Sequence, residues 1–192
     1  MSFAMGYEEM RALLEKSLKP SRYQHSLGVA ETAVFLAQRF GVAEEQAKTA
    51  GLLHDCAREF RNEDLIAEAE KRLIMVGDIE RQMPLLLHAY VGARLVNEKY
   101  GVSDRAVEQA IWRHTVGGAK MTDLDKIIWF ADMIEPNRDY PDVERLRELA
   151  QNASLDEMML AGLTQSISFV LQKGGLIHPD TVIARNEILL NR

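Results

Sequence analysis

Four of the five histidines in this sequence recur on the inward side of segments with helical periodicity, and imidazole nitrogen is a common ligand for metal ions. Two aspartates share that placement. Neutral imidazoles and carboxylates together form a donor set that suits Fe, Mn, Zn or Co better than Mg or Ca. Left unpaired in a core, these groups would cost several kcal/mol, a cost that a bound cation removes. We therefore expect a metal site made by His25, His54, Asp55, His88, His114 and Asp132.

The dipeptide His54-Asp55, in the run AGLLHDCA, is the sharpest local signal. Adjacent helical residues diverge by about 100°, so both side chains can reach a cation over the groove between them. A lone histidine on an apolar face is more often a hydrogen-bonded core residue, and the pair alone is a common sequence. Cys56 is expected to fill apolar space rather than to act as a thiol nucleophile. His178, before Pro179, is expected in a turn and not as a ligand.

Basic side chains lie close in sequence to these candidate ligands. Arg22 precedes His25 by three residues and Arg58 follows His54 by four, spacings that share a helical face. Guanidinium groups bind phosphate oxygens in pairs and neutralise their charge, so the pattern favours a phosphorylated substrate. A solvated surface charge is the alternative for each. The candidates for binding substrate are Arg22, Arg58, Thr115, Lys120 and Arg138, the hydroxyl of Thr115 being equally suited to ending its helix.

Helical periodicity with capping residues predicts the elements that must position these side chains. We expect helices that begin at a Ser21–Gln24 capping box and end at Gly41, span about 44–57, begin at Asn62 and run to about 74, and run from Pro84 to before Gly101. Further helices should begin near Ser103, run from Thr122 to Pro136, begin at a Ser154–Glu157 box, and span 179–190. No segment shows the alternation of apolar and polar residues that would indicate a β-strand. The fold class predicted is all-α, a compact single-domain helical bundle over residues 1–192.

The amino-acid composition limits the classes of molecule that the protein is expected to bind. The net charge is −6, from 29 acidic and 23 basic residues, with no Lys/Arg block, so polymeric nucleic acid is not an expected partner. A small anionic substrate stays open, because a bound cation reverses the local field. A single cysteine, no basic leader and no run of about 20 apolar residues predict cytoplasmic residence without a membrane span.

The order of the candidate ligands, H…HD…H…H…D, resembles the HD-domain superfamily of metal phosphohydrolases. The segments RYQHSLGVAETA, AGLLHDCAREF, LLLHAYVGARLV and IWRHTVGGAKMTDLDKIIWFADMIEPNRDY resemble more closely its YqeK family, described as symmetrical dinucleoside-tetraphosphate hydrolases. The resemblance covers roughly residues 21–185. One departure is visible: where the family usually has HDYAK, this chain has His54-Asp55-Cys56-Ala57-Arg58.

The resemblance implies an enzyme with a binuclear metal centre, iron favoured, and Mn, Zn or Co as options. By the same carry-over, His25, His54 and Asp132 hold one ion, His88 and His114 complete the other, and Asp55 bridges them. Asp55, Asp132 and Arg58 are then the catalytic residues. The implied reaction is symmetrical cleavage of diadenosine tetraphosphate to two ADP by a metal-bridging hydroxide.

Other functions fit the same residues. The metal centre would also serve a nucleotide phosphomonoesterase or phosphodiesterase, and a metal-containing nucleotide-binding regulatory module is a rival from a different class. The plainest rival is a helical structural protein with core histidines. A homodimer is a further option: Met158, Met159, Leu160 and Leu163 suit either core packing, which we favour, or a dimer face.

Overall fold

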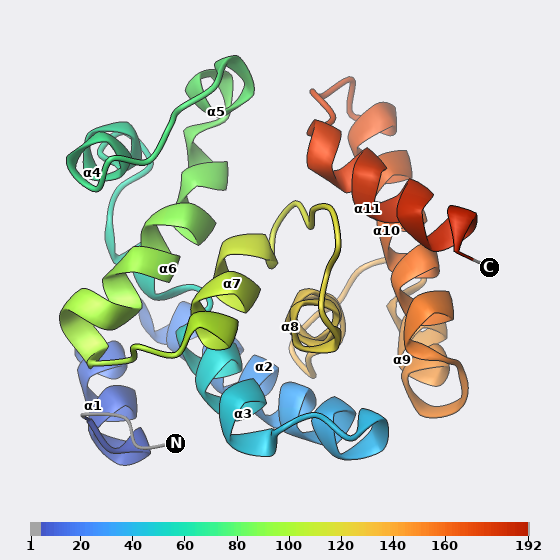
Figure 1. The fold of residues 1–192 in the computed structure, drawn as a ribbon, viewed down its shortest axis with the longest axis horizontal. Helices are drawn as coiled ribbons and strands as arrows, with labels where there is room; N and C mark the ends of the chain where they lie inside the picture. The colour runs from blue at the N-terminus through green and yellow to red at the C-terminus, as the bar shows by residue number, and fades with distance from the viewer. Residues whose placement is uncertain (1–4, 192) are drawn as a thin grey trace.

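The computed structural model of the chain describes residues 5–191, and all regular structure among them is helical. Figure 1 shows the helices in order along the chain. They are α1 (Tyr7–Ser17), α2 (Pro20–Phe40), α3 (Glu44–Leu53), α4 (Leu65–Lys71), α5 (Asp78–Gln82), α6 (Leu87–Tyr100), α7 (Arg105–Arg113), α8 (Asp123–Ile134), α9 (Val143–Asn152), α10 (Leu155–Gln172) and α11 (Pro179–Leu190). Two short 3₁₀ helices, η1 (Cys56–Glu59) and η2 (Pro84–Leu86), complete the set. The all-α prediction is confirmed.

Helix α8 lies at the centre of the molecule. It packs against α2, α3 and α7 on one side and against α9 and α10 on the other, and Figure 1 shows it nearly end-on. Its apolar residues Ile127, Ile128 and Phe130 are fully buried. Burial of such side chains stabilises a fold by about 1.5–3 kcal/mol each. Helix α8 is therefore the central helix against which the surrounding helices pack.

Among residues 5–191, helices α2 and α3 pack extensively against each other, and a glycine allows their close approach. A Cβ atom on Gly51 would lie 2.8 Å from Ala30 Cα and 3.1 Å from the carbonyl oxygen of Val29. Real Cβ contacts are not that short, so only glycine lets the two backbones approach here. The close approach at Gly51 fixes the position of the last turn of α3, next to His54.

Several helix ends follow the predicted chemistry. Gly41 and Gly101 end α2 and α6 in the left-handed conformation, with φ of 69° and 66°. Thr122 caps α8, and Ser154 with Glu157 forms the predicted capping box of α10. Core packing of Met158, Met159 and Leu163 is confirmed, since all three are fully buried, and Leu160 is partly buried against the same core.

Other predicted ends are wrong. Helix α2 begins one residue before Ser21, with Lys19 as N-cap and Pro20 in the first helical position. Ser21 therefore does not cap the helix. Asp64 rather than Asn62 precedes α4, which ends at Lys71. Asp104 rather than Ser103 caps α7, its carboxylate accepting from two backbone N–H groups. None of the helices described between residues 5 and 191 is long and apolar enough to cross a membrane.

Candidate metal centre

Six side chains that are spread over more than a hundred positions converge on one small region. Their ligand atoms fall into three overlapping groups, and within each group all atoms lie within 4.8 Å of one another. The groups are His25, His54 and Asp55; His54, His114 and Asp132; and Asp55, His88 and His114. The structure thus brings together every residue that the sequence predicted as a ligand.

The ends of helices supply most of these side chains. His54 and His114 stand at the C-caps of α3 and α7, where the helical backbone ends. His88 lies in the first turn of α6, directly after η2. Asp132 comes from the last turn of α8, and His25 alone lies well inside a helix, α2. Packing of α2, α3, α7 and α8 on one another therefore brings the cluster together.

Hydrogen bonds fix the orientation of three of the rings. Each of these rings has its Nδ1 atom beside the backbone carbonyl oxygen of the residue three positions earlier. A carbonyl oxygen only accepts, so each ring carries a hydrogen on Nδ1 and, in its neutral form, presents the lone pair of Nε2 to the centre. The pairs are His54 with Gly51 at 2.7 Å, His114 with Ile111 at 2.6 Å, and His88 with Leu85.

The Nε2 atoms face one another in pairs. The distance between His25 Nε2 and His54 Nε2 is 3.2 Å, and that between His88 Nε2 and His114 Nε2 is 3.0 Å. Burial, then the neighbouring His54 and His88, lower the pKa of His114 to about 3, so this ring is neutral. Lone pairs turned toward each other at such distances are unfavourable in a protein core without a cation. The donor set and its geometry therefore fit a divalent metal.

Asp55 lies between the two histidine pairs, one carboxylate oxygen toward each. Its Oδ2 atom is 3.4 Å from His54 Nε2 and 3.7 Å from His25 Nε2. Its Oδ1 atom is 3.1 Å from His88 Nε2 and 3.9 Å from His114 Nε2. Although burial opposes it, the imidazoles of His54 and His88 hold the pKa of Asp55 well below its usual range. An ionised carboxylate in this position can share its oxygens between two cations.

The cluster opens to solvent on the side of Asp132. The four histidines and Asp55 are each less than a tenth exposed, whereas the Asp132 side chain is 21% exposed. Its Oδ1 atom lies 3.0 Å from His25 Nε2 and 3.9 Å from His54 Nε2. Burial works to raise the pKa of Asp132, but His25, His54 and Arg138 lower it overall. A substrate would therefore approach from the Asp132 side.

Three arginines surround this opening. Arg22 Nη1 lies 2.7 Å from Asp55 Oδ2, and Arg138 donates to both the backbone carbonyl and the carboxylate of Asp132. Arg58 is half-buried in the field of Asp55, Arg22 and Asp132, and burial lowers its pKa. Its guanidinium forms no hydrogen bond with any residue from 5 to 191, so its donors are available to a ligand. All three arginines predicted to bind phosphate thus lie near the cluster.

The other two candidates differ. Thr115 Oγ1 lies 3.1 Å from His114 Nε2 and 3.3 Å from His88 Nε2, directly at the cluster. Lys120 lies in the loop between α7 and α8 with φ of 52°, and its backbone forms hydrogen bonds with the side chains of Glu187 and Arg113. Its side chain is exposed, so nothing in its surroundings distinguishes it from a solvated surface charge.

Sequence reasoning missed one residue that touches the cluster. Glu135, 1% exposed, lies just past the end of α8, and its Oε1 atom is 3.0 Å from His25 Nδ1. Its position three residues after Asp132, on the same helical side, was the available signal. His178 lies away from the cluster and caps α11 rather than lying in a turn, and it pairs with Glu80. Cys56 is fully buried, and burial raises the pKa of its thiol, in keeping with a packing role.

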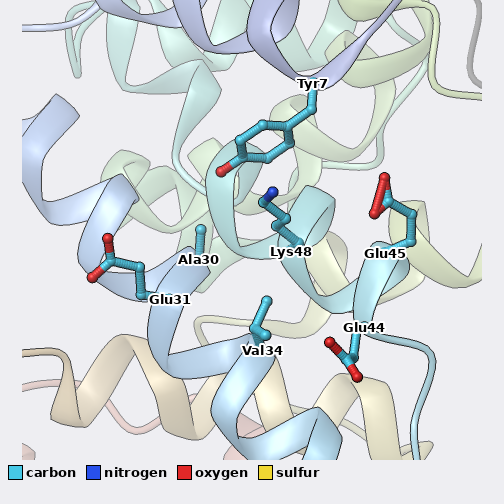
Figure 2. A pocket seen from close by; sticks show the side chains of 7 residues that line it. All are labelled: Tyr7, Ala30, Glu31, Val34, Glu44, Glu45 and Lys48. Atoms are coloured by element: carbon cyan, nitrogen blue, oxygen red, sulfur yellow. The ribbon is translucent and has the colours of Figure 1, made fainter.

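A separate hollow lies between α1, α2 and α3 and shares no residue with the cluster. Figure 2 shows its lining, in which the Lys48 ammonium sits 4.0 Å from the centre of the Tyr7 ring. Three glutamates, Glu31, Glu44 and Glu45, complete its polar part. With three acids against one base, this hollow is poorly suited to a polyphosphate.

Comparisons with known proteins agree with this geometry. The family model described as HD domain matches residues 22–137, which include all six clustered ligands. Proteins named symmetrical bis(5'-nucleosyl)-tetraphosphatase are similar over nearly their whole length. That of Halalkalibacterium halodurans is 39% identical over 94% of this chain and 95% of its own, and that of Bacillus subtilis is 37% identical over 95% and 97%. A crystal structure of a predicted HD superfamily hydrolase from Clostridium acetobutylicum, 37% identical, covers 98% of this chain and 100% of its own with a TM-score of 0.94.

Proposed function

The chain belongs to the HD domain family, and from that premise we propose that it is a metal-dependent phosphohydrolase that cleaves dinucleoside tetraphosphates symmetrically. In diadenosine tetraphosphate, water would add across the central phosphoanhydride bond and release two molecules of ADP. The observation that carries this proposal is the convergence of four bare Nε2 atoms around Asp55, beside three arginines. Near full-length similarity to two proteins that bear this name supports the choice of substrate.

We further propose that the centre is binuclear. Asp55 supports this, because one of its oxygens faces His25 and His54 while the other faces His88 and His114. Asp132 would complete the first half. When bound, a pair of divalent ions acidifies water and polarises phosphoryl oxygens. The nitrogen and carboxylate donors fit iron, which the family resemblance favours, as well as Mn, Zn or Co.

The chain's own residues would bind and orient the tetraphosphate. Arg58 has free donors and a planar fork that can bind two phosphate oxygens at once. Arg22 and Arg138 use part of their donors to hold Asp55 and Asp132, and their remaining N–H groups would bind phosphate oxygens. Thr115 is placed to donate its hydroxyl hydrogen to a phosphate oxygen. A role for Lys120 in substrate binding stays a prediction.

The test is a product analysis of the metal-loaded protein with diadenosine tetraphosphate in ¹⁸O-labelled water. We expect ADP as the sole nucleotide product, with one labelled oxygen in the terminal phosphate of half of the ADP molecules. Formation of ATP and AMP, or no turnover with Fe, Mn, Co or Zn, would contradict the proposal. The substitution Asp132→Ala should abolish both turnover and part of the bound metal while circular dichroism still shows a folded helical protein.

A substrate panel separates the alternative reactions. Nucleoside monophosphates, cyclic nucleotides and the dinucleoside diphosphate NAD should be turned over far more slowly than the tetraphosphate. Preference for a monophosphate or a cyclic nucleotide would assign the phosphomonoesterase or phosphodiesterase reaction instead. Binding of nucleotide with metal present and no turnover of any substrate would assign the regulatory module.

Two further proposals concern the cellular location and the oligomeric state of the protein. The single buried cysteine and ordinary charge composition favour cytoplasmic residence, which fractionation of the native cells would test. A homodimer also stays a prediction, and sedimentation of the purified protein would decide it.

A further inference from the structure

One of the four clustered rings is held differently from the others. His54, His88 and His114 each use a backbone carbonyl oxygen three residues earlier, which is accessible because these residues lie at helix ends. His25 lies inside α2, where backbone carbonyl groups are occupied by helical hydrogen bonds. Its Nδ1 atom instead meets the carboxylate of Glu135, at 3.0 Å. His25 is therefore the only one of the four whose orienting partner carries a full negative charge.

The surroundings of Glu135 lock its carboxylate in place. Its Oε2 atom accepts from the backbone N–H of Asn137 at 2.8 Å and from Asn137 Nδ2 at 3.0 Å, which leaves Oε1 for His25. The backbone around it is held as well, since Arg147 donates to the carbonyl oxygens of three residues between 134 and 138. A Cβ atom on Gly28 would lie 2.5 Å from Oε2, so glycine in α2 leaves the room that the carboxylate occupies.

We propose that Glu135 is a positioning residue that makes the two halves of the metal centre unequal. By accepting the Nδ1 hydrogen, it holds His25 in the tautomer whose Nε2 can bind a cation, and it adds negative charge behind that ring. The half made by His25, His54 and Asp132 then binds its metal more tightly than the half made by His88 and His114. This inference rests on the metal centre of the proposed function, not on the identity of the substrate.

The distribution of charge supports the inequality. Asp55 contributes one oxygen to each half, so it does not distinguish them. The first half has in addition the Asp132 carboxylate, 3.0 Å from His25 Nε2, and the Glu135 carboxylate behind the ring. The rings of the second half are backed by the neutral carbonyls of Leu85 and Ile111. Arg22 and Arg138 are paired with Asp55 Oδ2 and Asp132 Oδ1 in this same half, so they offset part of that charge. The Glu135 carboxylate forms no salt bridge with Lys or Arg among residues 5–191, so it is the acid whose charge remains to favour a divalent cation in the first half.

The substitution Glu135→Gln tests the tautomer directly. Three hydrogens point at the Glu135 carboxylate, two from Asn137 and one from His25. A glutamine has one oxygen and one NH₂ group, so its oxygen is expected to face the two Asn137 donors. Its NH₂ group then donates to His25 Nδ1, which moves the ring hydrogen to Nε2 and blocks the metal-binding nitrogen. The side chain keeps its volume, so the fold should be retained.

Two measurements follow, and neither depends on turnover. In long-range ¹⁵N–¹H NMR spectra of the Zn²⁺-loaded protein, His25 should carry its hydrogen on Nδ1 in the wild type and on Nε2 in Glu135→Gln. In a chelator competition titration with Mn²⁺, the wild type should lose its ions in two steps, and Glu135→Gln should weaken the tighter step by about 10–100-fold while leaving the weaker step unchanged.

The control is Asp125→Asn, which alters another buried carboxylate of α8 that does not contact the cluster. Asp125 is fully buried and bonded to Gln109, Arg113 and Thr122. This variant should leave both metal steps as in the wild type. Gly28→Ala, which displaces the Glu135 carboxylate by another route, should weaken the tighter step as Glu135→Gln does, and it supplies the test if the glutamine variant does not fold.

The proposal is overturned if the two wild-type steps have equal affinity, if Glu135→Gln leaves the tighter step or the Nδ1 hydrogen unchanged, or if Asp125→Asn weakens metal binding equally. Failure of the proposed function is a separate result. A protein that binds metal in two unequal steps sensitive to Glu135, yet does not hydrolyse the tetraphosphate, would keep this inference and reject that substrate.

Discussion

The imidazole rings of the cluster have their hydrogens on the outside and their lone pairs inside. That orientation comes from individual hydrogen bonds, three to backbone carbonyl oxygens and one to Glu135. When both rings are neutral, this arrangement adds no stability of its own, because the facing Nε2 atoms of His88 and His114, 3.0 Å apart, then have no hydrogen between them. Its use is to bind a cation, and the arginines nearby are suited to the anion that the cation would act on.

At Arg58 we predict a loss of substrate binding without a loss of metal. Replacing Arg58 with alanine removes the one nearby guanidinium that has no hydrogen bond among residues 5–191. Because hydrogen bonds to charged groups contribute about 1.5–3 kcal/mol, kcat/KM for diadenosine tetraphosphate should fall by about 10–100-fold. Steady-state kinetics with metal analysis on the same samples would measure this.

Arg61→Ala is the matched control for Arg58. Arg61 lies three residues further along, with a side chain that is 73% exposed and paired with Glu63 and Asp64. Exposed ion pairs contribute little, so its kinetics should equal those of the wild type. Equal losses in the two variants, or loss of metal in Arg58→Ala, would show that Arg58 does not act on the substrate.

The sequence was sufficient to predict the six side chains that meet in the cluster but not the residue behind His25. Histidines and aspartates on inward helical faces are identifiable because burial of such groups needs an explanation. Glu135 precedes a proline at a helix end, where a glutamate is ordinarily solvated, and only the packing of α8 against α2 brings it to His25. Likewise, no sequence pattern indicates that Lys120 has an exposed side chain whereas Arg58 is half-buried.

At the scale of the elements, the approach of α3 to α2 sets the position of His54. We predict that Gly51→Ala lowers the free energy of unfolding by about 1–3 kcal/mol, because its Cβ would overlap the backbone at Ala30. The two helices must separate, which moves His54 away from His25, so metal affinity should fall as well. Chemical denaturation and metal titration measure the two effects. Unchanged values for both would mean that the close contact has no such role.

Element boundaries were predicted well where one residue type decides them. Gly41 and Gly101 end their helices because glycine adopts the left-handed conformation without strain. Capping by Ser21, Asn62 or Ser103 was wrong. Pro20 takes the first position of α2 after Lys19, Asp64 precedes α4 without a side-chain capping bond, and the Asp104 carboxylate caps α7. The helix predicted over 44–57 ends at Leu53, and the backbone tightens into η1 so that His54 and Asp55 can both turn inward. Helices α1, α5 and α9 were not predicted individually.

At the scale of the whole molecule, one side-chain pair joins α5 to the start of α11. Glu80 Oε1 lies 2.9 Å from His178 Nε2, across 98 positions of sequence. Burial works to raise the pKa of Glu80, but the hydrogen bond from His178 and backbone N–H groups lower it below its ordinary value of 4.5. A lowered carboxyl pKa stabilises the fold above the ordinary value, and that stabilisation is lost as the pH falls through the folded-state pKa.

We therefore predict that Glu80→Gln is less stable than the wild type by about 1–2 kcal/mol near pH 7, with a difference that shrinks as the pH falls below 4.5. Urea denaturation at a series of pH values would measure it. A difference that stays constant with pH would show that the carboxylate charge does not contribute.

The helices outside residues 22–137 complete the fold around the HD domain region. Figure 1 shows α10 and α11 side by side at the right, and Thr181 of α11 donates to the carbonyl oxygen of Val116, two residues after His114. This contact joins the C-terminal helices to the loop that follows His114, a residue of the cluster. That residues 1–192 form a single folding domain stays a prediction, which a single cooperative unfolding transition would support.

The central claim, that six side chains bind metal together, is tested most directly by anomalous diffraction. Crystals of the metal-loaded protein would be measured on both sides of the absorption edge of the bound metal. We predict two anomalous peaks, one beside the Nε2 atoms of His25 and His54 with Asp132, the other beside those of His88 and His114, with Asp55 between them. A map with no peak inside this cluster, from protein shown to be active, would contradict the account.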